Sequence, residues 1–367
     1  SLWVNWPVTD NSKQHLILGG GEKFLHPNVD PSLLSGIMLN PMQQSEPSKI
    51  ALFAGAQYTW KQWKSEEEAK KLNDIAFNFV ENGHFEDSKV SAAFRELGKH
   101  MINQNMDGRV VKLEESVELA PKLTDFMTKL KAGQDVTAER ATLRAEFAKI
   151  KEAAELYKAS GDQKMVAQIH YWLDNAIDQM NALDAFLTGT EAMATNDAAK
   201  LWDSYYKGLK LYEQSQTHTF HYVDHLEKAE LGVQHIRPFI LSLKEVLASE
   251  VQKFLHPDQI ISTFITNRTG VEGGLAEVTD GDLSTHALIK SPNSIKTGDY
   301  IGMKFNKPVD IQTLTFAMGT QANPRDTFSK AEVQYQDEKD NWVSLKEPTY
   351  VGNESLVQFE NLNIKAK

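Results

Sequence analysis

The sequence contains no cysteine among its 367 residues, and this absence removes several kinds of chemistry. Disulfide bonds, thiolate nucleophiles and cysteine-ligated zinc sites are excluded. The absence suits many compartments, including the surface of a bacterium that does not use disulfides. Long hydrophobic runs are also missing, and no apolar stretch approaches the roughly 20 residues that a membrane-spanning helix needs.

An excess of basic residues is missing as well. Lysine and arginine total 39 against 50 aspartates and glutamates, which gives a net charge of −11. A nucleic-acid-binding domain carries clustered basic residues, so we expect no nucleic-acid partner. The first residues also lack the charged and apolar segments of a signal peptide. Because the sequence need not begin at the natural start of the protein, that lack does not decide localisation.

The residues that are present have the composition of a globular protein, with 41% hydrophobic and 24% charged residues. The length exceeds one typical domain, so two or three domains are expected. Three patterns follow one another along the chain. We therefore predict domains over residues 1–63, 64–255 and 256–367.

Residues 1–63 show α/β character. Short apolar runs at 2–4 and 36–39 predict strands, and Asn40-Pro41 ends the second one. A helix is predicted to begin at 45–48, with a proline in its first turn, and to continue through 49–60 with a helical apolar period. The order of strand, loop, strand and helix is typical of a βα unit, whose polar ends lie at the carboxyl ends of the strands.

Residues 64–255 are rich in helix-forming residues and poor in glycine. Apolar residues recur at helical spacing, with Glu66-Glu67-Glu68 at a favourable helix start. Helices of roughly 20 residues with short breaks predict an all-α antiparallel bundle. The breaks are predicted near Asn82-Gly83, Gly108, Gly133, Ser160-Gly161 and Gly189.

Residues 256–367 contain short β-rich runs between clusters of Gly, Asn, Asp and Pro, a pattern typical of an all-β sandwich. The domain boundary is predicted at His256-Pro257-Asp258. The runs are 260–265, 300–305, 311–318, 331–335, 342–345 and 356–359.

Polar and aromatic residues gather near the first strand. Asn5 and Asp10 suit sugar recognition, because a carboxylate accepts from two hydroxyls and a carboxamide both donates and accepts. Trp3 and Trp6 could supply apolar walls, and Asn40 would point into the same mouth if the two strands were adjacent. A structural interpretation stays open, in which both indoles lie in the core and residues 10–12 form a turn.

Two separated motifs occur in order, residues 3–10 (WVNWPVTD) and 40–52 (NPMQQSEPSKIAL), followed by Tyr58-Thr59-Trp60. This sequence resembles the last barrel strands of the family 84 glycoside hydrolases. These are bacterial β-N-acetylglucosaminidases, often labelled hyaluronidase, and relatives of the eukaryotic O-GlcNAcase. The resemblance implies the C-terminal remnant of a (β/α)8 barrel, and the helical region fits the bundle domain of the family in position and character.

The resemblance also implies roles for individual residues. Asn5 and Asp10 match residues that bind hydroxyls of a terminal N-acetylglucosamine, Trp3 matches a wall of the pocket, and Asn40 matches an asparagine lining the sugar site. Trp6 departs from the tyrosine expected in many members. The implied partner is the terminal N-acetylglucosamine of glycans or glycoproteins, and the implied location is secreted or cell-surface.

The catalytic pair of the family is missing. Its members use the substrate's own acetamide as nucleophile and two consecutive aspartates for acid–base work. The sequence contains no Asp-Asp pair and lacks most of the ~250 residues of a complete barrel. We therefore expect the C-terminal portion of a β-N-acetylglucosaminidase that is inactive alone and uses no catalytic cofactor. The alternative is a carbohydrate-binding or scaffold region that targets an enzyme to glycans.

Residues 278–286 (VTDGDLSTH) and 298–303 (GDYIGM), with 326–335 and 341–342, resemble the discoidin-like (factor V/VIII type C) modules. Such modules often hold a structural calcium where Asp280, Asp282 and Thr285 lie, although an Asp-Gly-Asp turn without metal is equally open. Trp342 is expected in the core. A closing strand is expected where residues 361–367 end the sequence, so the module is expected to be cut short or to continue.

Three histidines, His218, His221 and His225, have the spacing of one helix face, which could bring their imidazoles together for zinc. The favoured interpretation is a polar face between helices of the bundle, with Phe220, Tyr222 and Leu226 packing beside it. The glycines 19–21 lack a following phosphate-loop pattern and are predicted to form a loop.

Overall fold

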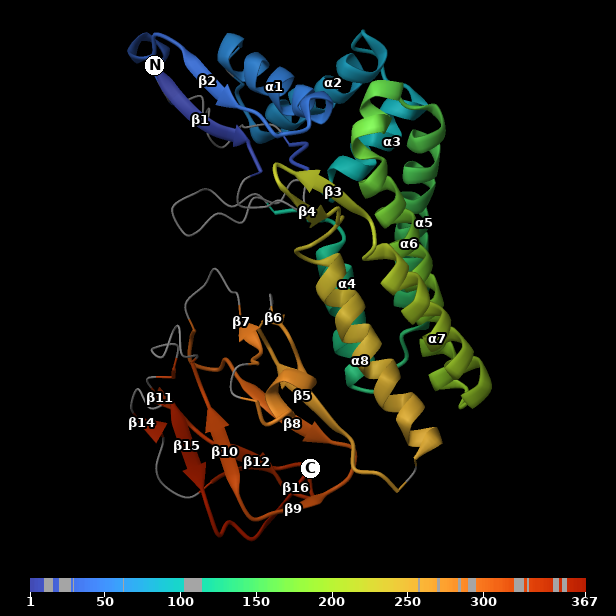
Figure 1. Cartoon of the computed structure of the whole chain (residues 1–367), viewed down its shortest axis with the longest axis vertical. Helices are drawn as coiled ribbons and strands as arrows, with labels where there is room; N and C mark the ends of the chain where they lie inside the picture. Colours follow the sequence, from blue (N-terminus) through green and yellow to red (C-terminus); the bar gives the residue numbers. More distant parts are fainter. Residues whose placement is uncertain are drawn as a thin grey trace. The chain divides into compact units, whose positions relative to one another are not determined.

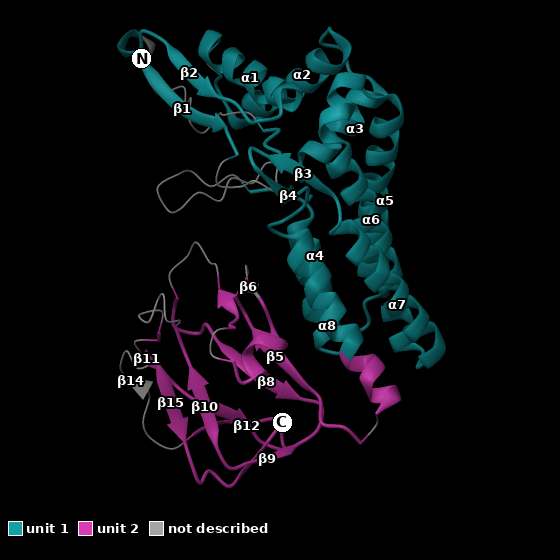
Figure 2. Cartoon of the chain, viewed as in Figure 1, with its two compact units in different colours: residues 1–248 teal, residues 249–367 magenta. Residues whose placement is uncertain are grey.

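The computed structural model describes residues 1–9, 16–19, 28, 30–61, 63–101, 114–256, 258–268, 271–282, 285–289, 295–319, 327–328, 330–345, 350–351 and 355–367 (Figure 1). The predicted helix break at Gly108 and most of the predicted glycine loop lie outside these residues. The chain divides into two compact units, Ser1–Ala248 and Ser249–Lys367 (Figure 2). Each unit is described by itself.

The first unit begins with the predicted βα arrangement. Strands β1 (Leu2–Pro7) and β2 (Ile37–Asn40) pair in parallel, with the 3-10 helix η1 (Pro31–Leu33) before β2 and helix α1 (Ser45–Trp60) after it. The register joins Val4 to Leu39 and Pro7 to Asn40, with an irregularity between these pairs. The carboxyl ends of both strands therefore meet at one edge.

The two indoles of β1 lie in different environments. Trp6 is fully buried and its indole Nε1 donates to the Gly19 carbonyl at 3.2 Å, whereas Trp3 is 61% exposed. Successive side chains of a strand point to opposite faces, so Trp3 and Trp6, three residues apart, lie on opposite faces of β1, and the exposed Asn5 and buried Val4 follow the same alternation. The core interpretation is therefore right for Trp6 and wrong for Trp3.

The described residues of the first unit contain seven further helices, the last of which continues past residue 248 into the second unit. They are α2 (Glu66–Asn82), α3 (Lys89–Gly98), α4 (Ala120–Lys131), α5 (Thr137–Ser160), α6 (Gln163–Ala194), α7 (Ala198–Ser215) and α8 (Ile236–Leu255). The Ser65 side chain caps α2 by accepting from the Glu68 amide, and the three predicted glutamates lie in the first turn. Gly83 ends α2 with φ of 73°, as its predicted break requires.

The predicted break near Gly189 is wrong, because α6 continues through this residue for 32 residues in all. A Cβ on Gly189 would lie 3.1 Å from the Leu247 side chain of α8. Glycine therefore serves close helix packing here and does not end the helix. A Cβ on Gly208 of α7 would lie even closer to the ring of Phe186 in α6, so α6 packs closely against α8 at Gly189 and against α7 at Gly208.

Apolar residues recur at helical spacing in the two longest helices, as predicted for residues 64–255, and they form the buried core. Figure 1 shows α5, α6 and α7 lying along one another. The buried residues of the predicted stripes are Leu143, Phe147, Ile150, Ala154 and Tyr157 in α5, and Ile169, Leu173, Met180 and Leu183 in α6. Within the described residues, no helix is long and apolar enough to cross a membrane.

The three histidines do not share a helix, so this prediction is wrong. Residues 219–228 form a hairpin of β3 (Thr219–Tyr222) and β4 (His225–Lys228). Phe220 and Tyr222 are both buried, which is the two-residue period of a strand. His218 pairs with Asp178 of α6 at 2.8 Å, and no metal-binding cluster of His, Asp and Glu occurs in the described part of the chain.

The second unit consists of short antiparallel strand pairs and α9 (Leu275–Thr279). The predicted β-rich runs are confirmed, while the described strands form two-stranded sheets and a sandwich is not confirmed. The pairs are β5 (Ser262–Thr266) with β8 (Ile301–Phe305), β6 (Val271–Glu272) with β7 (Leu288–Ile289), β9 (Val309–Ile311) with β16 (Ile364–Ala366), β10 (Leu314–Ala317) with β15 (Leu356–Phe359), β11 (Lys330–Ala331) with β14 (Tyr350–Val351), and β12 (Gln334–Gln336) with β13 (Trp342–Ser344).

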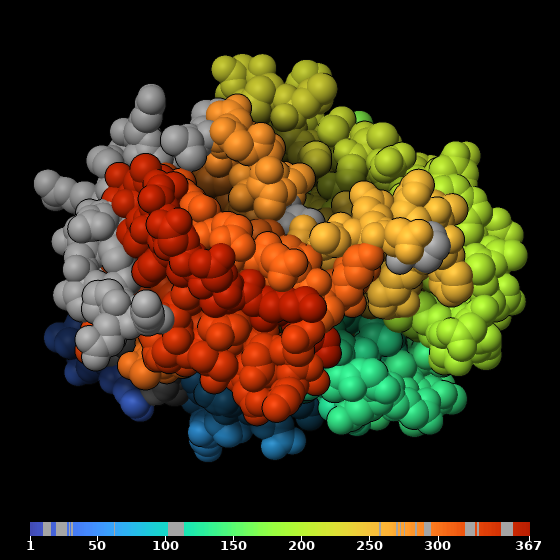
Figure 3. Space-filling model, turned by 90° about the horizontal axis from the view of Figure 1, so that it is seen from below, coloured from blue at the N-terminus to red at the C-terminus, as the bar shows by residue number. Residues whose placement is uncertain are grey.

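One expectation about this unit is confirmed and one is wrong. Residues 361–367 supply a strand, because β16 pairs with β9, and Figure 3 shows red residues from the C-terminal part of the chain against orange residues of the same unit. Trp342 is 60% exposed, so it is not a core residue. In β13 the half-buried side chain is Val343, and the alternation of the strand turns Trp342 outward.

Candidate sugar site

Three of the four predicted site residues come together at the edge where β1 and β2 end. The Trp3 indole Nε1 donates to Asn5 Oδ1 at 2.6 Å, and Asn40 Nδ2 donates to the same oxygen at 3.3 Å. The parallel pairing explains this meeting, because it brings both strand ends to one edge. Asp10 lies outside the described residues.

The cluster leaves polar atoms available to a ligand. Asn5 Oδ1 accepts from two donors, and within the described part of the chain neither Asn5 Nδ2 nor Asn40 Oδ1 has a hydrogen-bond partner. One atom can donate to a hydroxyl and the other can accept from one. The exposed Trp3 ring lies at the same edge and offers an apolar face. A neutral ring with several hydroxyls fits this combination.

The chemistry of these groups favours binding over catalysis. Carboxamides and an indole do not exchange protons near neutral pH, so Trp3, Asn5 and Asn40 cannot act as general acid or base. They can orient a bound sugar through hydrogen bonds, each contributing about 1 kcal/mol net. The described groups are therefore suited to binding and not to acid–base catalysis.

A second element lies beside this edge, the β3–β4 hairpin, which the sequence pattern does not predict. Gln43, three residues after Asn40, binds the hairpin at two points. Its Nε2 donates to the His221 carbonyl at 2.5 Å, and the Val223 amide donates to its Oε1 at 3.0 Å. Figure 1 shows the hairpin near the ends of β1 and β2. A lone glutamine carries no local signal, so only the folded arrangement reveals this contact.

The inner side of the hairpin is fixed to the helices. The Phe220 ring lies 4.5 Å, centroid to centroid, from Trp172 of α6, and Tyr222 is buried beside it. On the outer side, the His225 ring lies between carboxylates, 2.9 Å from Asp224 and 2.8 Å from Glu227. The hairpin therefore joins the helical region to the strand edge.

Two buried titratable groups lie where α3 ends. Glu115 exchanges hydrogen bonds with the backbone amide and side chain of Gln234, and burial raises its pKa to about 8. His100 has Nδ1 2.7 Å from Ser116 Oγ, and burial lowers its pKa to about 4. These contacts connect segments distant in sequence, so both residues belong to the internal structure of the unit.

The residues expected to hold calcium follow α9 and form hydrogen bonds with one another. Asp280 Oδ1 accepts from the Asp282 amide at 2.8 Å, and its other carboxylate oxygen accepts from the Thr285 hydroxyl at 2.5 Å. Thr285 also approaches the Asp282 carbonyl at 2.9 Å. Hydrogen bonds among these residues engage both Asp280 oxygens, and the calcium site stays a prediction.

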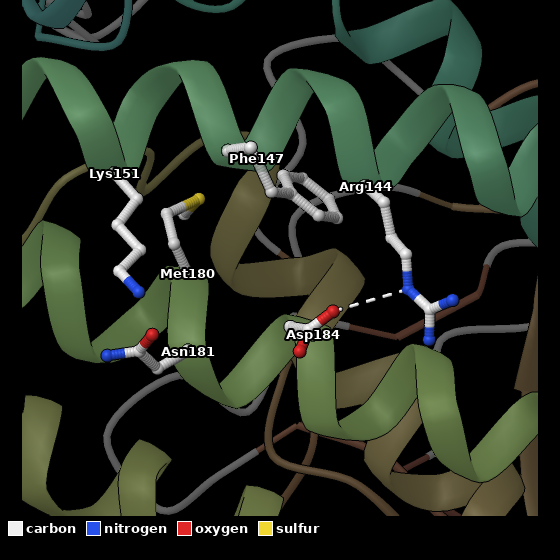
Figure 4. Close-up of a pocket in the computed structure, with 7 residues that line it drawn as sticks. Arg144, Phe147, Lys151, Met180, Asn181 and Asp184 are labelled. Carbon is white, nitrogen blue, oxygen red and sulfur yellow. Dashed lines mark ion pairs between the residues drawn. The ribbon is translucent and has the colours of Figure 1, made fainter.

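A hollow of about 160 Å³ lies between α5 and α6 (Figure 4). Arg144 and Asp184 form an ion pair at one end, with Nε and Oδ1 3.2 Å apart, while Lys151 and Asn181 face the other end. Phe147 and Met180 form its buried floor. Because Arg144 also pairs with Glu191, its charge is neutralised within the helices, and the hollow holds none of the predicted sugar-site residues.

Matches to two known families follow the order of the strand-edge region and the helical region along the chain. Residues 1–98 match the model of the beta-N-acetylglucosaminidase family, and residues 118–219 match that of the hyaluronidase post-catalytic domain-like family. The first match contains β1, β2 and α1 to α3, and therefore the Asn5 cluster. The second contains α4 to α7.

Solved structures share this fold. The structure of CpGH84D has 26% identity and a TM-score of 0.60, and the match covers 68% of this chain and 40% of that one. The structure of CpGH84B has 21% identity, a TM-score of 0.53, and coverage of 66% and 39%. A variant of the Thermobaculum terrenum O-GlcNAc hydrolase has 17% identity, a TM-score of 0.53, and coverage of 70% and 51%. The last two show the fold alone.

The two family matches indicate part of a glycosidase catalytic domain at residues 1–98, followed by a helical domain at residues 118–219. The chain is therefore related, over these residues, to the β-N-acetylglucosaminidases of glycoside hydrolase family 84. It spans 39% to 51% of the length of the structures given above.

Proposed function

We propose that this chain is the C-terminal portion of a β-N-acetylglucosaminidase and holds the terminal N-acetylglucosamine of a glycan or glycoprotein. The observation that carries the proposal is the convergence of Trp3, Asn5 and Asn40 on one oxygen at the ends of β1 and β2. Asn5 and Asn40 bind sugar hydroxyls, Trp3 covers a ring face, and Asp10 supplies a carboxylate acceptor.

In the proposed parent enzyme the reaction is retaining and assisted by the substrate's acetamide. One of two consecutive aspartates orients the acetamide and the other protonates the leaving oxygen. No Asp-Asp pair occurs in this sequence, so this chain binds the sugar and does not cleave it alone. The parent is proposed to be secreted or attached to the cell surface.

Titration calorimetry tests the sugar-binding role directly. The unmodified chain should bind N-acetylglucosamine, and Asn5→Ala should weaken binding about tenfold, because it removes one hydrogen bond and the oxygen that positions Trp3 and Asn40. Asn181→Ala is the matched control, since it removes a carboxamide from the hollow between α5 and α6. Equal affinities for all three chains would contradict the proposal.

The second candidate function is glycan binding by residues 256–367, proposed here as a discoidin-like sandwich. Its support is Trp342, whose exposure offers an aromatic face to a sugar ring. Trp342→Ala should abolish retention on an immobilised glycan while binding of free N-acetylglucosamine stays intact.

A structural calcium at Asp280, Asp282 and Thr285 stays a prediction, and a rise in melting temperature on adding calcium would support it.

A further inference from the structure

The turn of the β3–β4 hairpin is the most exposed part of an otherwise well-anchored element. Val223 is 82% exposed and Leu226 is 59% exposed, whereas Phe220 and Tyr222 on the same hairpin are buried. The Asp224 carboxylate is also exposed. The hairpin thus presents two apolar side chains and one acid to solvent on a fixed base.

The backbone of this turn is strained. Val223 has φ of 55°, a left-handed conformation that is rare for a β-branched residue and that hairpin turns normally assign to glycine. Its amide donates to Gln43 Oε1, so the contact with the segment after β2 helps to hold the strained conformation. Strain of this kind gathers at ligand-contacting positions, where the surrounding structure maintains it.

The turn lies next to the strand edge that carries the sugar cluster. Gln43 follows Asn40 by three residues, which limits the distance between their Cα atoms to about 11 Å. Because Gln43 touches the backbone at both His221 and Val223, the turn is held beside the carboxyl end of β2. A chain of several residues attached to a sugar at Asn5 and Asn40 is long enough to extend to the turn.

This inference rests on the proposed sugar site: we infer that the tip of the β3–β4 hairpin, with Val223 and Asp224 in the turn and Leu226 in β4, binds the polypeptide that carries the N-acetylglucosamine. The exposed apolar side chains gain by burial against apolar side chains of a peptide. Asp224, with Glu227 nearby, attracts a basic side chain and repels a uronate. The chemistry of the turn therefore fits a peptide with apolar and basic residues better than an acidic glycan.

Titration calorimetry with three probes tests the inference. The probes are the methyl glycoside of N-acetylglucosamine, a peptide with N-acetylglucosamine on serine flanked by leucine and lysine, and N-acetylglucosamine linked to glucuronate. The unmodified chain should bind the glycopeptide about tenfold more tightly than the methyl glycoside. Leu226→Ser and Asp224→Asn should each reduce this preference to about threefold or less, with the methyl glycoside unaffected.

Leu255→Ser is the matched control, because Leu255 is a leucine of similar exposure, 57%, at the end of α8. It should leave the preference for the glycopeptide unchanged. An undiminished preference in both hairpin variants, no preference in the unmodified chain, or tighter binding of the uronate probe would overturn the inference while the sugar site stands. A chain that binds none of the probes would overturn the proposed function and the inference together.

Discussion

The two tryptophans of β1 are expected to have different roles: the buried Trp6 stabilises the fold, and the exposed Trp3 contacts the ligand. Trp6→Ala should lower the free energy of unfolding by about 3–5 kcal/mol, because it empties a fully buried site and removes the indole bond to Gly19. Trp3→Ala should cost less than about 0.5 kcal/mol and should weaken N-acetylglucosamine binding, since its ring is exposed beside Asn5. Urea unfolding and calorimetric titration of both variants measure these effects, and the opposite assignment would contradict the site.

The sequence could predict the strand that contains these indoles but not which indole enters the core. Period-two alternation separates the faces of a strand without saying which face meets the rest of the protein. In β1 the face that carries Val4 and Trp6 is the buried one, and the face that carries Trp3 and Asn5 is exposed. For the same reason Asn5 and Asn40 could be proposed as neighbours, while their shared bond to one oxygen required the three-dimensional arrangement.

Glu115 makes stability depend on pH. Its native pKa of about 8 exceeds the ordinary value of 4.5, so between these values the folded chain holds a proton that the unfolded chain has released. Stability therefore falls as pH rises through this window, by about 1 kcal/mol per pH unit from this group. Glu115→Gln keeps a neutral hydrogen-bonding side chain, and it should be the more stable protein at pH 9 by urea unfolding.

The stabilities of the unmodified chain and Glu115→Gln are best compared from pH 7 to 9. His100 has its native pKa lowered to about 4, so it opposes stability only when pH falls below the ordinary histidine value of 6.5. Above pH 7 this effect is small in both proteins. Parallel stability curves for the unmodified chain and Glu115→Gln would show that the buried carboxyl does not hold its proton.

At the level of elements, the close packing of α7 on α6 requires a residue without a side chain at position 208. Any Cβ on Gly208 would overlap the fully buried ring of Phe186. Gly208→Ala should therefore destabilise the protein by about 1–2 kcal/mol, although alanine favours helix by about 1 kcal/mol. Adding Phe186→Leu should recover part of the loss in a double-mutant cycle, whereas purely additive changes would contradict close packing here.

The sequence predicted helices better than their interruptions. Long apolar stripes identified α5 and α6, because a 3.6-residue period sustained over many residues is a strong signal. Gly189 looked like a break, but its role is close contact with Leu247, which depends on a partner far along the chain. The β3–β4 hairpin was mistaken for helix because the histidine spacing fits a helical face while Phe220 and Tyr222 follow the period of a strand.

At the scale of the whole molecule, two compact units should unfold separately. They divide at residues 248 and 249, within α8, and the sugar cluster lies entirely in the first. Calorimetry should therefore show two transitions, and N-acetylglucosamine should raise the melting temperature of only one, because a ligand stabilises the unit that binds it. One transition that shifts as a whole would contradict independent units.

The order of α/β, helical and β-rich regions could be predicted from composition and period, because each depends on local sequence. The β-rich region illustrates the limit. Its strands were predicted, yet their partners join residues as distant as Val309 and Ala366, and such pairings leave no local signal. Trp342 was misplaced for the same reason, since exposure depends on what covers a strand.

The central claim is that this chain holds N-acetylglucosamine without cleaving it. The most direct measurement follows binding and nitrophenol release together, with the purified chain and a nitrophenyl β-N-acetylglucosaminide. We expect saturable binding that Asn5→Ala weakens, and no release of nitrophenol, because the sequence has no Asp-Asp pair. Release of nitrophenol that Asp10→Ala abolishes would contradict the claim.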